Sequence, residues 1–147
     1  MNNLKRFLDA QSTSYHQAEK EIINGRKAGH WMWFIFPQLA TLGRSQMAQY
    51  YAIRDLKEAR EYLKHSLLGS RLLTLMNILE NSEKRDAHEI FGSPDDLKFH
   101  SCITLFRRAA MEEPEFIMND AFRILDAALT KFFGGKEDVK TVELLKA

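Results

Sequence analysis

Apolar residues recur at intervals of three and four positions along the whole chain, and the strict apolar–polar alternation of half-buried strands is absent. The longest regular stripe contains Leu68, Leu72, Leu75, Met76 and Leu79. Residues at this spacing share one face of a helix, so the stripe predicts a long amphipathic helix. The same spacing elsewhere predicts an all-α fold: a compact single-domain bundle of roughly eight helices with orthogonal packing and no sheet.

Capping residues place the expected helix boundaries. A short first helix begins near Leu4, and a capping box of Ser14 and Gln17 opens a second helix that ends at Gly25. A later helix begins after Ser45. The remaining expected boundaries are a capping box at Asp55 and Glu58, a short helix from Asp86 to Phe91 ended by Gly92, a helix capped by Ser93 with Pro94 in its first turn, a helix from Pro114 to the Gly134–Gly135 pair, and a last helix capped by Asp138.

The run from Trp31 to Phe36 is apolar throughout. Periodicity alone allows either a buried strand or a helix that is apolar on every side. The helix is the favoured interpretation, because no partner strand is predicted elsewhere. Pro37 should end it, since the residue before a proline avoids the helical region. Gln38, just beyond, could read a polar edge of a ligand.

Composition and charge narrow the function classes. The 147 residues fit one domain, from 1 to 147, and the apolar and charged fractions of 45% and 28% are those of a globular protein. A net charge of +1 disfavours nucleic acid as a partner. Cys102 is the only cysteine, which suits a reducing compartment. No apolar stretch has the length of a signal peptide or a membrane span, so the sequence predicts a cytoplasmic protein without membrane contact.

The first candidate segment for ligand binding places cations beside tryptophans. Arg26, Lys27 and His30 precede Trp31 and Trp33. In a helix, Arg26 and His30 would share a face, as would Lys27 and Trp31. Cations beside indole rings hold anionic, planar ligands. The alternative is that the tryptophans belong to the core and the cations solvate a helix end.

The second candidate segment is the helix predicted after Ser93. On a helical wheel Lys98 falls inside the edge of the apolar arc, near the positive end of the helix dipole. Asp95 or Asp96, another carboxylate or a bound anion should compensate its charge, although its aliphatic stem could also snorkel toward solvent. Ser101 adjoins Lys98 one turn later. The candidate ligand-binding residues are Arg26, Lys27, His30, Trp31, Trp33, Gln38, Asp96, Lys98, Ser101 and Thr104.

The usual signatures of cofactor and metal sites are missing. The chain contains no phosphate loop, no Gly-x-Gly-x-x-Gly, no His-Glu-x-x-His and no nucleophile elbow. Its five histidines are scattered without the spacing of metal ligands. We therefore expect no metal and no cofactor, and the sequence assigns no catalytic residue.

Several long motifs occur together in this chain. They are Arg26-Lys27, His30-Trp-Met-Trp-Phe-Ile-Phe-Pro-Gln38, Tyr51-Ala-Ile53, Leu68-Gly-x-Arg-Leu72, Phe91-Gly-x-x-Asp-Asp-x-Lys98-x-x-Ser-x-x-Thr-Leu-Phe106 and Gly135-x-x-Asp138-x-x-Thr141. With these motifs the chain resembles the bacterial family catalogued as domain of unknown function 1810. The resemblance implies a compact all-helical domain and brings no established activity. Members sometimes carry the label calpastatin, but true calpastatin is a disordered inhibitor and nothing of that kind is present here. A loose analogy links such families to NAD and ADP-ribose metabolism.

Two classes of function follow. In the first, the protein binds or processes a small anionic ligand of the nucleotide or ADP-ribose type. The cations would meet phosphate, a tryptophan would stack on the base, and Asp96 or His30 would transfer protons. This hypothesis requires the two candidate segments to share one pocket. In the second, the chain is a protein–protein interaction module or a homodimer without catalysis, which would present exposed aromatic residues to its partner.

Overall fold

The computed structural model describes residues 4–40, 42–111 and 113–146, and within these ranges it contains ten helices and no strand. The all-α prediction is confirmed. None of these helices has the length and apolar character that crossing a membrane requires. The helices are α1 (Lys5–Ile23), α2 (Met32–Ile35), α3 (Gln46–Tyr50), α4 (Leu56–Lys64), α5 (Leu68–Asn81), α6 (Ala87–Phe91), α7 (Asp95–Ala110), α8 (Pro114–Met118), α9 (Ala121–Phe133) and α10 (Val139–Lys146).

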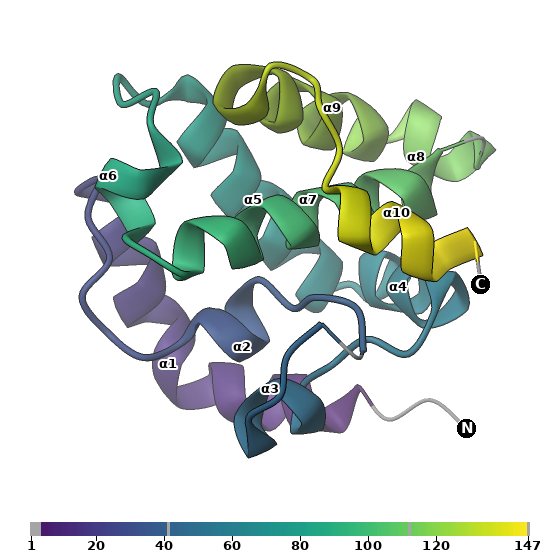
Figure 1. The fold of residues 1–147 in the computed structure, drawn as a ribbon, viewed down its shortest axis with the longest axis horizontal. Helices are drawn as coiled ribbons and strands as arrows, with labels where there is room; N and C mark the ends of the chain where they lie inside the picture. The colour runs from purple at the N-terminus through teal and green to yellow at the C-terminus, as the bar shows by residue number, and fades with distance from the viewer. Residues whose placement is uncertain (1–3, 41, 112, 147) are drawn as a thin grey trace.

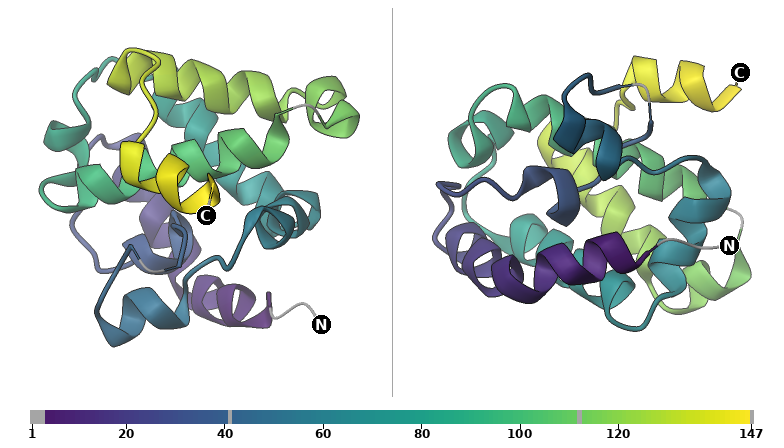
Figure 2. Two further views of the ribbon diagram at one scale, coloured as in Figure 1. Left: turned by 45° about the vertical axis from the view of Figure 1, so that its right-hand side comes forward. Right: turned by 90° about the horizontal axis from the view of Figure 1, so that it is seen from below.

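Helix α7 lies in the middle of the fold and contacts α4, α6, α9 and α10 (Figure 1). Seen from below, α1 and α10 lie on opposite sides of the molecule (Figure 2). The chain between α2 and α4 is held by an isolated parallel bridge between Leu39 and Ile53. In this arrangement the segment after α2, the start of α7 and the start of α10 lie next to one another, and a pocket opens between them.

The N-terminal helix differs from the prediction, because α1 is continuous from Lys5 to Ile23 and no new helix opens at Ser14. The capping box predicted at Ser14 and Gln17 is absent: both residues lie inside the helix, and the Gln17 amide donates to Glu21. The apolar stripe before and after this point is joined by Gln11, a buried polar residue in its middle. Its amide nitrogen donates to the carbonyl of Phe34 and the hydroxyl of Tyr62, and its oxygen accepts from Arg71. A polar residue at a core position hid the continuity of the stripe.

Two other boundaries also differ. Ser93 does not cap α7: Pro94 is the cap residue, and the Ser93 hydroxyl donates to Asp96 instead. The single helix expected after Pro114 is two helices, α8 and α9. The chain turns between them at Asp120, which adopts a left-handed φ of 67°, and the Asn119 side chain accepts the first free backbone N–H of α9.

The other expected boundaries are confirmed by their hydrogen bonds. Ser45, Asp55 and Asp86 each accept a backbone N–H in the first turn of α3, α4 and α6. The apolar run after His30 is helical at α2, as favoured. Gly92 and Gly134 follow α6 and α9 with φ of 71° and 62°, a region that glycine enters without steric cost.

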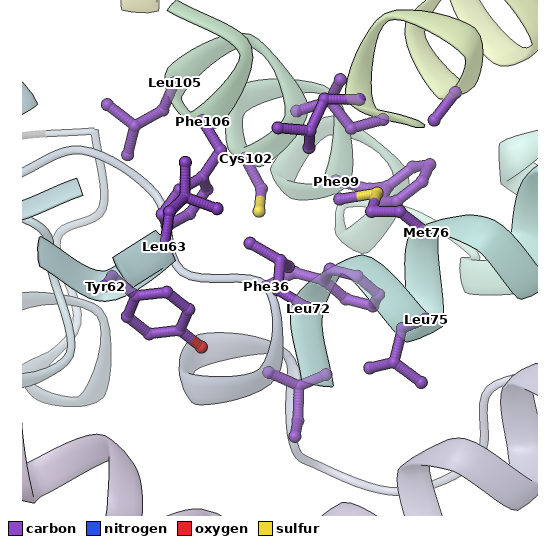
Figure 3. Close-up of a cluster of buried hydrophobic side chains, with 14 of the residues drawn as sticks. Phe36, Tyr62, Leu63, Leu72, Leu75, Met76, Phe99, Cys102, Leu105 and Phe106 are labelled. Carbon is purple, nitrogen blue, oxygen red and sulfur yellow. The ribbon is translucent and has the colours of Figure 1, made fainter. Parts of the chain in front are cut away.

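The core surrounds α7 and the end of α2. Phe36 meets Phe91 and Phe99 edge to face, with ring centroids 5.7 and 5.3 Å apart. Figure 3 shows Phe36 among side chains from α4, α5 and α7. Cys102 lies in this cluster with no exposed surface, and burial raises the pKa of its thiol. The thiol is therefore a packing group here, not a nucleophile.

Gly69 lets α4 and α5 meet closely, since a Cβ at this position would clash with the backbone carbonyl of Leu63. Gly69→Ala should lower the free energy of unfolding by about 1–3 kcal/mol. Helix propensity alone predicts the opposite sign, about 1 kcal/mol in favour of alanine. Urea unfolding measures the change, with Ser70→Ala on the exposed side of the same helix as control. A Gly69→Ala variant as stable as the wild type would show that the junction is loose.

Candidate functional site

A pocket of about 300 Å³ opens where three distant segments meet. Gln38 and Leu42 come from the chain after α2, Lys98 and Ser101 from α7, and Lys140 from α10. Of the predicted ligand-binding residues, Gln38, Lys98 and Ser101 therefore share one cavity. The complete lining is Gln38, Leu42, Gly43, Pro94, Leu97, Lys98, Ser101, Asp138 and Lys140.

Lys98 is the central cation of this pocket. Its side chain is only 26% exposed, and its ammonium lies 5.3 Å from the ring centre of Trp33. The nearest carboxylate oxygen, on Asp95, is 3.7 Å away, too far for a strong hydrogen bond. Trp33 adds a buried indole N–H that no described residue accepts. Lys98 is thus held in place by an aromatic face while its charge is only weakly paired.

Asp95 joins the two candidate segments. Its carboxylate lies 2.8 Å from the Lys27 ammonium, much closer than it lies to Lys98. Lys27 also donates to the carbonyl of Gly29 at 2.6 Å and sits 5.1 Å from the ring centre of Trp31. The contact between Lys27 and Asp95 therefore brings the loop after α1 against the first turn of α7.

Glu21, at the end of α1, holds that loop in shape. One carboxylate oxygen accepts the backbone N–H groups of Ala28 and Gly29 at 2.7 and 2.8 Å. The same oxygen accepts the indole N–H of Trp31 at 2.9 Å, and the other accepts from Gln17 at 2.8 Å. Burial raises the pKa of Glu21, but these hydrogen bonds outweigh it and bring the pKa to about 2. Trp31 is only 2% exposed, so its ring packs in the core while its N–H donates to Glu21.

The hydroxyls of α7 secure the start of α10. One oxygen of Asp138 accepts from the Ser101 hydroxyl at 3.1 Å and from the hydroxyl and backbone N–H of Thr141 at 2.6 and 3.1 Å. The Thr104 hydroxyl accepts the Asp138 N–H at 2.9 Å and donates to the carbonyl of His100. Thr104 is fully buried. Both predicted hydroxyls are thus engaged in docking α10, and only Ser101 lines the pocket.

The turn before Asp138 is fixed by a bidentate ion pair. Arg108 lies 2.6 and 2.7 Å from the two carboxylate oxygens of Glu137. The hydrogen bond from Arg108 lowers the pKa of Glu137. This geometry is the strong form of an arginine–carboxylate pair, so it positions the first turn of α10.

Seven of the ten predicted residues lie outside the pocket lining: Lys27, Trp31, Trp33 and Thr104, whose contacts are described above, and Arg26, His30 and Asp96. Arg26 and His30 are exposed, and neither has a side-chain hydrogen bond or ion pair to another described residue. Asp96 faces the other way, with one oxygen 3.3 Å from the His88 ring and the other accepting the N–H of Leu97. Their part in ligand binding stays a prediction.

Asp138, Lys140 and Leu97 are pocket residues that the sequence did not single out. The sequence predicts Asp138 as a helix cap and as part of a motif, not as a ligand-binding residue, and Lys140 stands among the charged residues of a short amphipathic helix. Nothing local distinguishes these positions, because they reach Lys98 through the fold and not through sequence spacing. Leu97 is 63% exposed at the pocket edge, an unusual exposure for leucine that appears only in three dimensions.

A larger pocket of about 510 Å³ is lined by residues of the segment after α2, the start of α4 and the end of α10, namely Leu39, Ala40, Arg54, Asp55, Leu56, Lys57, Leu144 and Leu145. Its arginine, Arg54, is already paired with the carboxylate of Glu58 at 3.2 Å. The larger pocket also contains Lys57, which is exposed, whereas the smaller pocket combines the mostly buried Lys98 with two other predicted residues, Gln38 and Ser101, so it is the better candidate site. Across the described ranges, no group of three or more His, Cys, Asp or Glu side chains is arranged to hold a metal ion.

Comparison with known proteins gives a family and a structural match. The family model described as "Protein of unknown function (DUF1810)" matches residues 1–145. The chain is similar to the conserved hypothetical protein Rv1873 from Mycobacterium tuberculosis, whose crystal structure was determined at 1.38 Å. The two are 46% identical over 98% of this chain and 96% of that one, with a TM-score of 0.88. No curated protein matches the chain.

Proposed function

We propose that this chain, which belongs to the DUF1810 family, binds a small anionic ligand of the nucleotide type in the pocket of Lys98. The observation that supports the proposal is the weak pairing of the Lys98 ammonium, which lies over Trp33 and 3.7 Å from its nearest carboxylate. A lysine in this setting gains from a closer anionic partner. Lys140 lines the same pocket and brings a second positive charge.

The size of the pocket favours a mononucleotide. Ligand pockets span roughly 300–1,000 Å³, and about 300 Å³ lies at the lower end of this range. ADP-ribose, with two phosphates and two sugars, would have to extend beyond the lining residues. The proposal is limited to binding, since His30 and Asp96, the residues predicted to move protons, are not among those that line the pocket.

Removing the Lys98 charge should remove most of the affinity. Lys98→Gln is expected to weaken binding of adenosine monophosphate at least tenfold, because a hydrogen bond to a charged group contributes roughly 1.5–3 kcal/mol. Isothermal titration calorimetry with phosphate, pyrophosphate, adenosine monophosphate and ADP-ribose measures the change. Lys20→Gln removes one charge from an exposed position on α1 and should leave affinity unchanged.

A thermal-shift series provides an independent readout. A ligand present at 100 times its Kd should add about 2.7 kcal/mol to the free energy of unfolding. No response to any of these anions, or equal affinities of the wild type and Lys98→Gln, would contradict the proposal.

A further inference from the structure

We infer that the carboxamide of Gln38 selects the ligand of this pocket, and that it favours a heteroaromatic ring with a donor beside an acceptor, as on the edge of an aminopurine. The inference rests on the proposed function, because Gln38 and Lys98 line the same pocket. Lys98 and Lys140 would hold the anion, and Gln38 would distinguish one ring from another.

The backbone of Gln38 is held rigidly. Its carbonyl accepts the N–H of Ile53 at 2.9 Å, and the carbonyl of Ile53 accepts the N–H of Ala40 at 2.7 Å. These bonds flank the bridge between Leu39 and Ile53, two residues that are 5% and 0% exposed. Because the backbone is held in this way, the Cα of Gln38 has a fixed position, which a selective contact by its side chain requires.

The side chain of Gln38 is free to contact a ligand. It is half-buried, and it has no hydrogen bond to any residue that the structure describes. Gly43 leaves it room, because a Cβ there would come within 3.3 Å of the Gln38 amide nitrogen and would clash with Ala48. By contrast, the side chains of Ser101 and Asp138, two other polar residues of the pocket, form hydrogen bonds that dock α10.

The chemistry of a carboxamide defines the ligand class. Glutamine offers an acceptor oxygen and a donor nitrogen side by side, and this pair matches the N6 donor and N7 acceptor of adenine. A lysine or a carboxylate offers only donors or only acceptors. The pocket also supplies apolar surface for a flat ring, from Leu42, Pro94 and the exposed Leu97.

The test compares two nucleotides that differ at this edge. At the edge that carries N7, inosine monophosphate presents two acceptors, O6 and N7, where adenosine monophosphate presents the N6 donor beside N7, so one carboxamide orientation cannot serve both acceptors there. The donor–acceptor pair of inosine monophosphate, N1–H beside O6, lies on a different edge of the ring, so the test addresses reading of the N7 edge. We expect the wild type to bind adenosine monophosphate about tenfold more tightly than inosine monophosphate, by titration calorimetry. Gln38→Met, similar in length and without hydrogen-bonding groups, should reduce the affinity for adenosine monophosphate until the two nucleotides bind equally.

The outcomes separate the two proposals. If both nucleotides bind the wild type equally, or if Gln38→Met keeps the wild-type preference, the role of Gln38 is refuted while anion binding stands. If neither nucleotide binds but pyrophosphate does, the ring-reading role is likewise refuted. If no anion binds at all, both proposals fail. Gln38→Glu serves as a second variant: its carboxylate can still accept from the N6 amino group but meets only acceptors on inosine monophosphate, so it should weaken both nucleotides by its charge and keep the preference for adenosine monophosphate.

Discussion

Replacing Glu21 by glutamine is expected to lower the free energy of unfolding at pH 7 by roughly 3 kcal/mol. The side chain is 7% exposed, and its pKa falls from 4.5 to about 2 in the folded protein. Each pKa unit corresponds to about 1.4 kcal/mol of preference for the charged form. Glutamine keeps the shape and one acceptor oxygen, so the change reports the charge that Ala28, Gly29 and Trp31 bind.

The direction of the pKa shift determines how the stabilisation by Glu21 changes with pH. Because the folded pKa of Glu21 lies below the unfolded value, its stabilisation is fully present above about pH 4.5 and is lost as the pH falls toward 2. The stability gap between the wild type and Glu21→Gln should therefore shrink over this window. Urea unfolding at pH 6, 4.5 and 3 measures it, with the exposed Glu83→Gln as control. A gap that stays constant from pH 6 to pH 3 would contradict the assignment.

The same substitution has a consequence for the site. Glu21 shapes the loop from which Lys27 reaches Asp95, and Asp95 is the only carboxylate within 4 Å of Lys98 among the described residues. If the loop loosens, Asp95 is free to approach Lys98 and to compete with an anionic ligand. The hydrogen bonds of the buried Glu21 carboxylate are thus linked, through this loop, to the number of negative charges near Lys98.

Lys98 shows what the sequence can predict about this site. Its position inside the apolar arc of a helix follows from spacing alone, and a neighbouring aspartate was among the expected compensating groups. In the structure Asp95 is only a distant partner, and the face of Trp33 supports the ammonium. The aromatic support could not be read from the sequence, because Trp33 belongs to a different helix, α2, and meets Lys98 only through the fold.

Trp31 and Glu21 show where sequence reasoning ends. A tryptophan beside cations fits a stacking platform and a core residue equally well, and the choice depends on where its N–H is bound. Its partner, Glu21, is an acidic residue on the buried face of α1, next to Ala18 and Ile22. Only the path of the loop after α1 brings the two together. Gln11 is a similar case: it is polar in the sequence and so interrupts the apolar stripe of α1, although its side chain is buried and the helix is continuous.

Removing the Asp138 carboxylate is expected to release α10. Only one residue of this helix, Thr141, is buried, and an isolated helix of eight residues is unstable in water. Asp138→Ala removes the acceptor of three hydrogen bonds from Ser101 and Thr141. A combined loss of roughly 3 kcal/mol would raise the open population of α10 about a hundredfold. Hydrogen exchange of the amides of residues 142–146 measures this change.

The released helix should also weaken the pocket, since α10 carries Lys140. We expect Asp138→Ala to reduce the affinity for adenosine monophosphate about tenfold, while the exchange of amides in α5, far from this junction, changes much less. Glu143→Ala, exposed on the same helix, is the matched control. Thr141→Val removes the 2.6 Å hydrogen bond but keeps the buried shape, so its exchange rates should lie between wild type and Asp138→Ala. Wild-type protection of α10 in Asp138→Ala would mean that Leu145, the ion pair of Arg108 and Glu137 and the contact to Thr104 hold the helix without the carboxylate.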